Sequence, residues 1–205
     1  MLILTFDQFR TLDIPGVQPV SSKAFFQSLD FIKQADWILF PDYWQVNILV
    51  HVLQRRIFPN MATYHLGHDK VQMTRALMAV APQHLPDTHI LSNSEENQYK
   101  VVSELFSFPF VAKDVKNSGG NGVFLIENRK DWTRYCLDHS ILYVQEYLPI
   151  SRDMRIVVIG RKVVSGYWRE QQEGRFHTNV AQGGNVSFES IPAQALALVE
   201  WMAQQ

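Results

Sequence analysis

The residues best suited to chemistry lie in one glycine-rich segment, from Lys113 to Val123. Glycines at positions 119, 120 and 122 allow backbone N–H groups to turn toward a single anion, because glycine adopts conformations that other residues avoid. Lys113, directly before this loop, could add an ammonium charge to the same anion. A polyphosphate suits such a loop, although glycines alone slightly favour an ordinary hairpin turn.

The order of these residues excludes three familiar nucleotide-binding loops. A P-loop requires a lysine followed by serine or threonine at its end, whereas Gly122 is followed by Val123 and Phe124. A dinucleotide-binding fingerprint requires a helix after the loop, but residues 123–126 form a short apolar run typical of a strand. In protein kinases the glycine loop precedes the strand lysine, and here Lys113 comes first.

A strand lysine followed by a glycine hairpin resembles the ATP-grasp superfamily, and further segments extend the resemblance. Residues 144–149 resemble the strand that receives adenine and ribose in that superfamily. Residues 151–160 resemble the D-x-R-x-x-V-x-G strand of its RimK-like, glutathione synthetase-like carboxylate–amine ligases, and residues 169–184 resemble their R…F-x-x-N-x-x-x-G-G segment. Upstream, residues 67–70 are similar to the helix start that carries the first nucleotide-contacting lysine.

The resemblance implies a role for each matching residue. Lys70 and Lys113 would donate to the phosphates. Arg169 would neutralise charge on the transferred phosphate, and Asn179 would contact phosphate or metal, so these two are the expected catalytic residues. Asp153 would lie near the ribose, and Arg155 would be mainly structural. The remaining expected nucleotide-binding residues are Ser118, Gly119, Gly120 and Gly122 at the phosphates, and Gln145, Glu146, Tyr147 and Leu148 at the adenine and ribose.

The implied reaction activates a carboxylate as an acyl phosphate, which an amine then attacks. The cofactors would be ATP and, for the complete fold, Mg²⁺; the substrates would be an unknown carboxylate and amine, such as an amino acid, a peptide or a protein terminus. The family holds Mg²⁺ with an acidic residue on a late strand and an E-x-N pair on the next. Neither follows Asn179, where the remaining carboxylates are Glu189 and Glu200.

We therefore expect the chain to stop before the fold is complete and to have little ligase activity by itself. A non-catalytic nucleotide-binding or interaction module is the alternative. His65, His68 and His177 lack cysteine partners and a recognised spacing, so no metal site is predicted.

Composition limits the other function classes. The 205 residues are 46% hydrophobic, which suits a folded protein with a buried core. The net charge of −1 gives no field that would attract nucleic acid or an anionic membrane. Cys136 is the single cysteine, which favours a reducing, cytoplasmic compartment. No apolar run is long enough for a transmembrane helix. The sequence leaves a homo-oligomer open.

Hydrophobic periodicity predicts the elements that position these residues. Apolar runs at residues 2–6 and 37–40, with helical spacing between them, predict a parallel βαβ unit. Helices are expected over 69–80, 94–106 and 192–202. From residue 108 onward, short β-branched runs and a tight turn at 160–162 predict antiparallel strands. On successive strands joined by that turn, Arg155 and Arg169 can project from one face.

The predicted fold class is α/β (α+β): an ATP-grasp fold with an N-terminal parallel α/β lobe and a largely antiparallel nucleotide-binding lobe. The pattern changes between residues 88 and 108. By resemblance we expect an N-terminal pre-ATP-grasp domain over residues 1–66 and an ATP-grasp domain, incomplete at its C-terminus, over 67–205.

Overall fold

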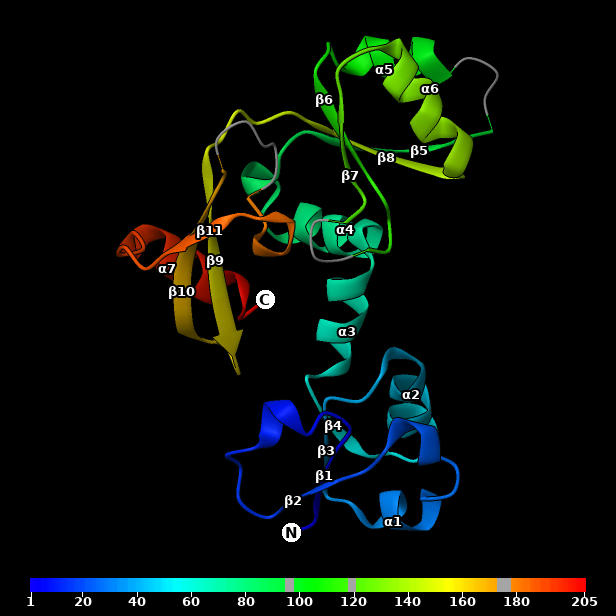
Figure 1. Ribbon diagram of the computed structural model, residues 1–205, viewed down its shortest axis with the longest axis vertical. Helices are drawn as coiled ribbons and strands as arrows, with labels where there is room; N and C mark the ends of the chain where they lie inside the picture. The colour runs from blue at the N-terminus through cyan, green and yellow to red at the C-terminus, as the bar shows by residue number, and fades with distance from the viewer. Residues whose placement is uncertain (95–97, 118–120, 173–177) are drawn as a thin grey trace. The chain divides into compact units, whose positions relative to one another are not determined.

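The computed structural model describes residues 1–94, 98–117, 121–172 and 178–205. These residues form two compact units, Met1–His68 and Asp69–Gln205 (Figure 1). Each unit has a hydrophobic core of its own. Within the described ranges, no helix combines the length and apolar character that a membrane span requires.

The N-terminal unit is built on a four-stranded parallel sheet of order β2-β1-β3-β4. Its core gathers the central residues of the sheet, Leu4 and Ile38, with Ile32 and Leu49 from the helical segments. The predicted βαβ unit is confirmed, because β1 and β3 are parallel neighbours with α1 between them in the chain. The strands are β1 (Ile3–Thr5), β2 (Val17–Pro19), β3 (Trp37–Leu39) and β4 (Arg56–Phe58).

The helical segments of this unit are short. Those between β1 and β3 are the 3-10 turns η1 (Phe9–Thr11) and η2 (Ser22–Ala24) and the helix α1 (Leu29–Gln34). Those after β3 are α2 (Tyr43–Asn47), the π-helical segment η3 (Ile48–Val52) and α3 (Met61–His68).

The C-terminal unit contains a four-stranded sheet of order β5-β8-β6-β7, in which every pair is antiparallel. Side chains alternate between the two faces of a strand. Phe110 and Ala112 of β6 and Leu142 and Val144 of β8 therefore share one face, and their core cluster includes residues of α5 and α6. These elements are β5 (Thr88–Ser92), α5 (Gln98–Leu105), β6 (Phe110–Lys113), β7 (Val123–Ile126), α6 (Arg129–Asp138) and β8 (Ile141–Glu146).

The opposite face of this sheet meets α4 (Lys70–Val80), which is followed by the 3-10 turn η4 (Pro82–His84). Asp69 caps α4, and its carboxylate accepts from the backbone N–H groups of Val71 and Gln72. The buried hydroxyls of Thr74 and Tyr143 lie 2.7 Å apart, which joins α4 to β8. Alternation thus sends odd-numbered residues of β6 and β8, Lys113 among them, away from α5 and α6.

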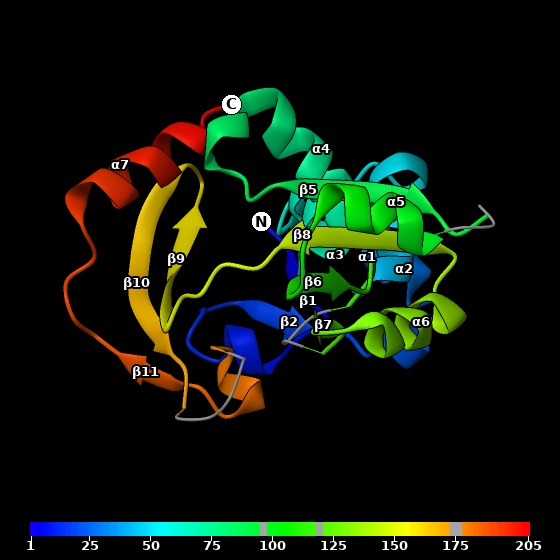
Figure 2. The same ribbon diagram turned by 90° about the horizontal axis from the view of Figure 1, so that it is seen from above.

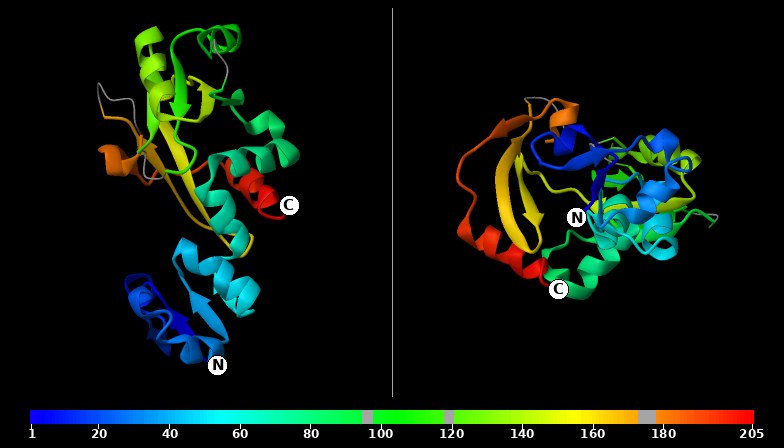
Figure 3. Two further views of the ribbon diagram at one scale, coloured as in Figure 1. Left: turned by 90° about the vertical axis from the view of Figure 1, so that its right-hand side faces the viewer. Right: turned by 90° about the horizontal axis from the view of Figure 1, so that it is seen from below.

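A second sheet of order β11-β10-β9 completes the unit. It consists of β9 (Arg152–Ile159), β10 (Lys162–Glu170) and β11 (Asn185–Ser187), with the 3-10 turn η5 (Val180–Gln182) before β11. The β9–β10 hairpin is yellow to orange in Figure 3, and α7 (Ala193–Met202) contacts it (Figure 2). Gly160 and Arg161 at the turn have φ of 63° and 92°, as a two-residue hairpin of type I′ requires. The tight turn, the antiparallel strands and the final helix are therefore confirmed.

Candidate functional site

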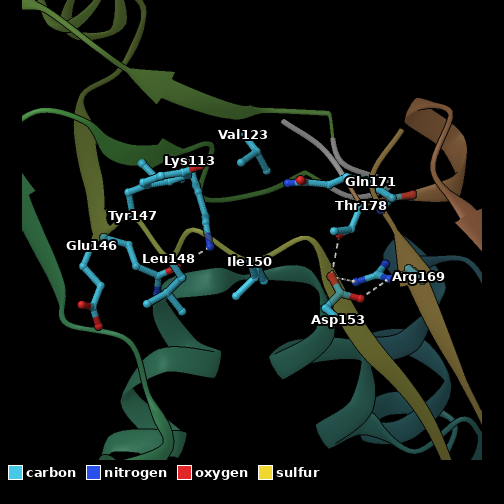
Figure 4. A pocket seen from close by; sticks show the side chains of 13 residues that line it. Lys113, Val123, Glu146, Tyr147, Leu148, Ile150, Asp153, Arg169, Gln171 and Thr178 are labelled. Carbon is cyan, nitrogen blue, oxygen red and sulfur yellow. Dashed lines mark hydrogen bonds and ion pairs between the residues drawn. The ribbon is translucent and has the colours of Figure 1, made fainter. Parts of the chain in front are cut away.

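A cavity of about 310 Å³ lies in the C-terminal unit, where the odd-numbered face of β6 and β8 meets the start of the β9–β10 hairpin. Figure 4 shows Glu146, Tyr147 and Leu148 on one side of it and Asp153, Arg169 and Thr178 on the other. The residues predicted for the site that line this cavity are Lys113, Gln145, Glu146, Tyr147, Leu148, Asp153, Arg169 and Asn179.

The other predicted residues do not line this cavity. Lys70 contacts Asp114 and Asn117 in the first part of the glycine loop, and Gly122 closes the loop against Asp114, as described below. Arg155 is exposed on β9. Ser118, Gly119 and Gly120 lie outside the described residues.

Lys113 is placed in the cavity by strand alternation. Its register partners Tyr143 and Val123 share its face, and its Nζ donates to Gln145 Oε1 at 2.6 Å. Burial, together with the positive charge of Lys70, lowers the pKa of Lys113 to about 8. This ammonium thus lies in an environment that disfavours its charge, which an anion bound nearby would offset.

Lys70 begins α4 and lies against the glycine loop. Its Nζ donates to the carbonyl oxygens of Asp114 at 2.8 Å and Asn117 at 2.9 Å. Burial lowers the pKa of Lys70, and the negative charges of Asp114 and Asp69 oppose that shift. In this conformation the donors of Lys70 therefore hold the loop backbone.

Gly122 closes the loop in a position that only glycine fits. Its φ is 70°, in the left-handed region. A Cβ built on Gly122 would overlap the carboxylate of Asp114, and Asp114 N donates to Gly122 O at 2.8 Å. This glycine therefore allows the end of the loop to approach Asp114 closely.

Gly122→Ala is expected to destabilise the C-terminal unit by more than the roughly 1–2 kcal/mol that a left-handed alanine costs alone. Gly160→Ala is the matched control, because Gly160 also has a positive φ of 63° but a Cβ there meets nothing within 4 Å. Urea unfolding of both variants would measure the difference. Equal losses of unfolding free energy would show that Asp114 yields to the new methyl group without cost.

Asp153 and Arg169 form an ion pair with two hydrogen bonds in the cavity. Strand register places them opposite each other on β9 and β10. Arg169 Nε donates to Asp153 Oδ1 at 2.7 Å, and Nη2 donates to Oδ2 at 2.9 Å. Thr178 Oγ1 also donates to Asp153 Oδ2, at 2.6 Å. Asp153 therefore fixes the plane of the Arg169 guanidinium, and the Nη1 donors are not used by this pair.

Arg155 lies two residues from Asp153 on β9, opposite Tyr167. Residues two apart share a face of a strand, so the register places Arg155 and Arg169 on one face, as predicted.

Glu146 occupies the other side of the cavity, at the end of β8. Its Oε1 accepts from Asp87 N at 2.8 Å, and its own N donates to Asp87 O at 2.9 Å. These two bonds tie the end of β8 to the start of β5. The expected contact of Glu146 with adenine or ribose remains a prediction.

Asn179 lies at the entry to η5, where its side-chain Oδ1 accepts from Ala181 N at 3.1 Å. Gly184 N donates to Asn179 O at 3.0 Å, and a Cβ on Gly184 would overlap the carbonyl oxygen of Thr178. Gly183 before it has φ of 93°. The two glycines thus let the chain turn tightly beside Thr178 and Asn179.

The sequence interpretation missed several residues that line the cavity, namely Val111, Val123, Ile150, Gln171 and Thr178. Val111 shares its face with Lys113 by alternation, so a period of two could have identified it. Gln171 and Thr178 carry no comparable signal in the sequence.

The described ranges contain no group of three or more histidine, cysteine, aspartate or glutamate side chains that could hold a metal ion.

The chain is similar to several known proteins. Residues 67–201 match the RimK-like ATP-grasp domain. A probable alpha-L-glutamate ligase of Citrobacter koseri is 32% identical over 152 residues, which are 66% of this chain and 49% of that protein. The ribosomal protein bS6–L-glutamate ligase of Escherichia coli O139:H28 is 30% identical over 154 residues, 68% of this chain and 50% of the relative. The chain thus spans about half the length of these curated relatives.

Among solved structures, the D-alanine–D-alanine ligase of Bacillus anthracis complexed with ATP superimposes with a TM-score of 0.69 at 14% identity. The alignment covers 99% of this chain and 78% of that one. This likeness concerns the fold alone, and it confirms the predicted ATP-grasp fold. The family match confirms the predicted resemblance: the chain belongs to the RimK-like ATP-grasp family.

Proposed function

We propose that the chain binds ATP in the cavity beside Lys113 and Arg169, and that the whole protein is an ATP-dependent ligase that joins a carboxylate to an amine. The observation that carries this proposal is the pair of lysines at the glycine loop. The charge of Lys70 contributes to lowering the pKa of Lys113 to about 8. A polyphosphate placed between two such ammonium groups would favour the charged form of both.

The rest of the cavity suits a nucleoside. Val111, Val123, Leu148 and Ile150 give it apolar walls. The backbone of residues 147–148 continues from β8 beside these walls and can offer N–H and C=O groups to a base. In our proposal the adenine lies against this segment, with Gln145, Glu146, Tyr147 and Leu148 around it.

In the proposed mechanism, bound ATP supplies the phosphoryl group that activates the carboxylate; an amine then attacks the acyl carbon and inorganic phosphate leaves. Lys70, Lys113 and the glycine loop with Ser118, Gly119, Gly120 and Gly122 hold the phosphates. Arg169 is preorganised by Asp153, so it can neutralise charge that develops on the transferred group without moving. Asn179 would contact the phosphate, and Arg155 would support the strand beside it.

The names of the two relatives suggest a substrate. Both are called glutamate ligases. We therefore propose that L-glutamate provides the amine and that a peptide or protein provides the carboxylate. Mg²⁺ would enter with ATP, held mainly by the phosphate oxygens. A cytoplasmic location, a homo-oligomer and a division into a pre-ATP-grasp domain (1–66) and an ATP-grasp domain (67–205) complete the proposal.

A module that binds the nucleotide without turnover is the second candidate. It is favoured by the finding that the described residues contain no group of three or more histidine, cysteine, aspartate or glutamate side chains that could hold a metal ion. Both candidates predict ATP binding, but only the ligase predicts turnover.

Calorimetric titration of the purified chain should give saturable binding of ATP and much weaker binding of AMP, because the proposed charged contacts are made to the outer phosphates. Lys130→Ala should keep the same preference for ATP over AMP, since Lys130 is exposed on α6 and does not line the cavity. Equal affinities for ATP and AMP would contradict the proposed role of Lys113. An ADP-release assay of the whole protein with L-glutamate and acidic peptides then separates the ligase from the module.

A further inference from the structure

We infer that His139 is a positioning residue for the glycine loop: held as an imidazolium between Asp114 and the end of α6, it fixes the backbone that carries Lys113. The part of this inference that concerns ATP affinity rests on the proposed function. The part that concerns the protonation and rigidity of the loop base does not.

Both ring nitrogens of His139 face hydrogen-bond acceptors. Nε2 lies 2.6 Å from Asp114 Oδ1, and Nδ1 lies 2.7 Å from the carbonyl oxygen of Tyr135. A neutral imidazole has a single N–H, so it would satisfy one contact and set a lone pair against an oxygen in the other. Only the doubly protonated ring donates to both. The geometry therefore assigns the imidazolium.

Asp114 provides the complementary charge. Burial by itself raises the pKa of the Asp114 carboxyl, but hydrogen bonds from Asn117 and His139, with the charges of His139 and Lys70, bring it below its ordinary value. The carboxylate is thus ionised and can only accept, which excludes the arrangement in which a protonated Asp114 donates to a neutral ring. The side chains of His139 and Asp114 are 18% and 26% exposed, so water screens this pair only partly.

The surroundings of the ring also favour a cation. His139 is the C-cap of α6, where the helix dipole stabilises positive charge. Tyr135 stacks on the ring with centroids 4.1 Å apart, and Phe124 meets it edge-on at 5.8 Å. The charged groups nearby are Asp131, Arg134 and Asp138 of α6, which line a cavity of about 220 Å³ beside the ring, and Lys70, which bonds the Asp114 carbonyl.

These contacts reach the proposed nucleotide site through the backbone. Tyr135 Oη donates to Lys113 O at 2.8 Å, so α6 holds two consecutive residues at the end of β6. Asp114 then touches both sides of the loop: its Oδ2 accepts from Asn117 Nδ2 at 2.9 Å, and its N donates to Gly122 O at 2.8 Å. Release of Asp114 would loosen the loop base and the segment from which Lys113 extends.

The first test needs no substitution. Long-range ¹H–¹⁵N NMR of the ligand-free chain should show both nitrogens of His139 protonated at neutral pH, while His89 serves as an internal comparison. His89 pairs with Asp87 at 3.2 Å through Nε2, on a more exposed surface. A neutral His139 ring at neutral pH would overturn the inference, whatever the ATP titration of the wild-type chain shows.

The second test uses His139→Phe, which keeps a ring for Tyr135 and Phe124 but removes both donors. Amide exchange at Asp114 should be slow in the wild type at neutral pH, because His139 holds the Asp114 carboxylate in place. In His139→Phe the exchange should be fast. ATP affinity should fall roughly three- to tenfold, as for the loss of one hydrogen bond.

His89→Phe is the matched control and should leave both measurements unchanged. In an Asp114→Asn background, His139→Phe should add little, because the partner charge is already absent. Slow exchange at Asp114 in His139→Phe would overturn the positioning role. Failure of the wild-type chain to bind ATP would instead contradict the proposed function and leave the exchange experiment interpretable.

Discussion

Lys113→Met is expected to weaken ATP binding by about 1.5–3 kcal/mol, roughly ten- to 150-fold, because it removes a charge-assisted contact to the phosphates. Methionine fills a similar volume and leaves the strand alternation of β6 intact. Calorimetric titration measures the loss, and Lys130→Met is the control because that lysine is exposed on α6. Unchanged ATP affinity in Lys113→Met would refute the placement of the phosphates.

The lowered pKa of Lys113 gives the same variant a second, independent signature. A phosphate beside Lys113 raises its pKa above the ligand-free value of about 8, so ATP binding near that pH should take up protons. Titrations in two buffers of different ionisation enthalpy would detect this uptake in the wild type. The uptake should shrink in Lys113→Met and persist in Lys130→Met.

In the ligand-free chain, Lys113 makes the free energy of unfolding change with pH in the direction opposite to that of a lysine in a stabilising ion pair. Between about pH 8 and the ordinary lysine pKa of 10.5, the unfolded chain retains a proton that the folded chain has lost. The free energy of unfolding should therefore rise with pH in that window because of Lys113. This contribution should be absent in Lys113→Met.

Much of the fold could be predicted because long periodic segments carry their own signal. The helices α4 and α7 and the strands from β6 to β10 all show apolar spacing that decides their type. The missed elements lack such a signal. Helix α3 contains Gly67 and buries none of its residues, while β4 begins at Arg56 and has only three residues. The pairing of β4 with β3, and the partial packing of Met61 and Tyr64 against the N-terminal core, determine these elements more than any local pattern.

The candidate site was predictable where it depends on ordered motifs and less so where it depends on register. Lys113 and Arg169 could be identified from their place in the motif order. The ion pair of Arg169 with Asp153 depends on the register of β9 and β10. The position of the turn sets that register. The contact of His139 with Asp114 links residues 25 apart, with β7 and α6 between them in the chain, and no spacing rule indicates it.

Asp153 has two competing roles, and its substitution should decide between them. The family resemblance places it near the ribose, whereas its bonds to both Arg169 and Thr178 make it the support of the guanidinium. If Asp153 acts through Arg169, Asp153→Ala in the whole protein should lower kcat by roughly 10²–10³, the cost of losing one preorganised charge-stabilising donor. A ribose contact would instead appear mainly as a higher KM for ATP.

The double variant Asp153→Ala/Arg169→Ala distinguishes these cases most sharply. Residues that act as one unit are not additive, so the double variant should be no slower than Arg169→Ala alone. Glu189→Ala is the control: Glu189 pairs with Arg152 on the same hairpin, but the two side chains are 64% and 44% exposed, and such a pair contributes little. If the losses in kcat from Asp153→Ala and Arg169→Ala multiply in the double variant, Asp153 makes a contact of its own and the supporting role is wrong.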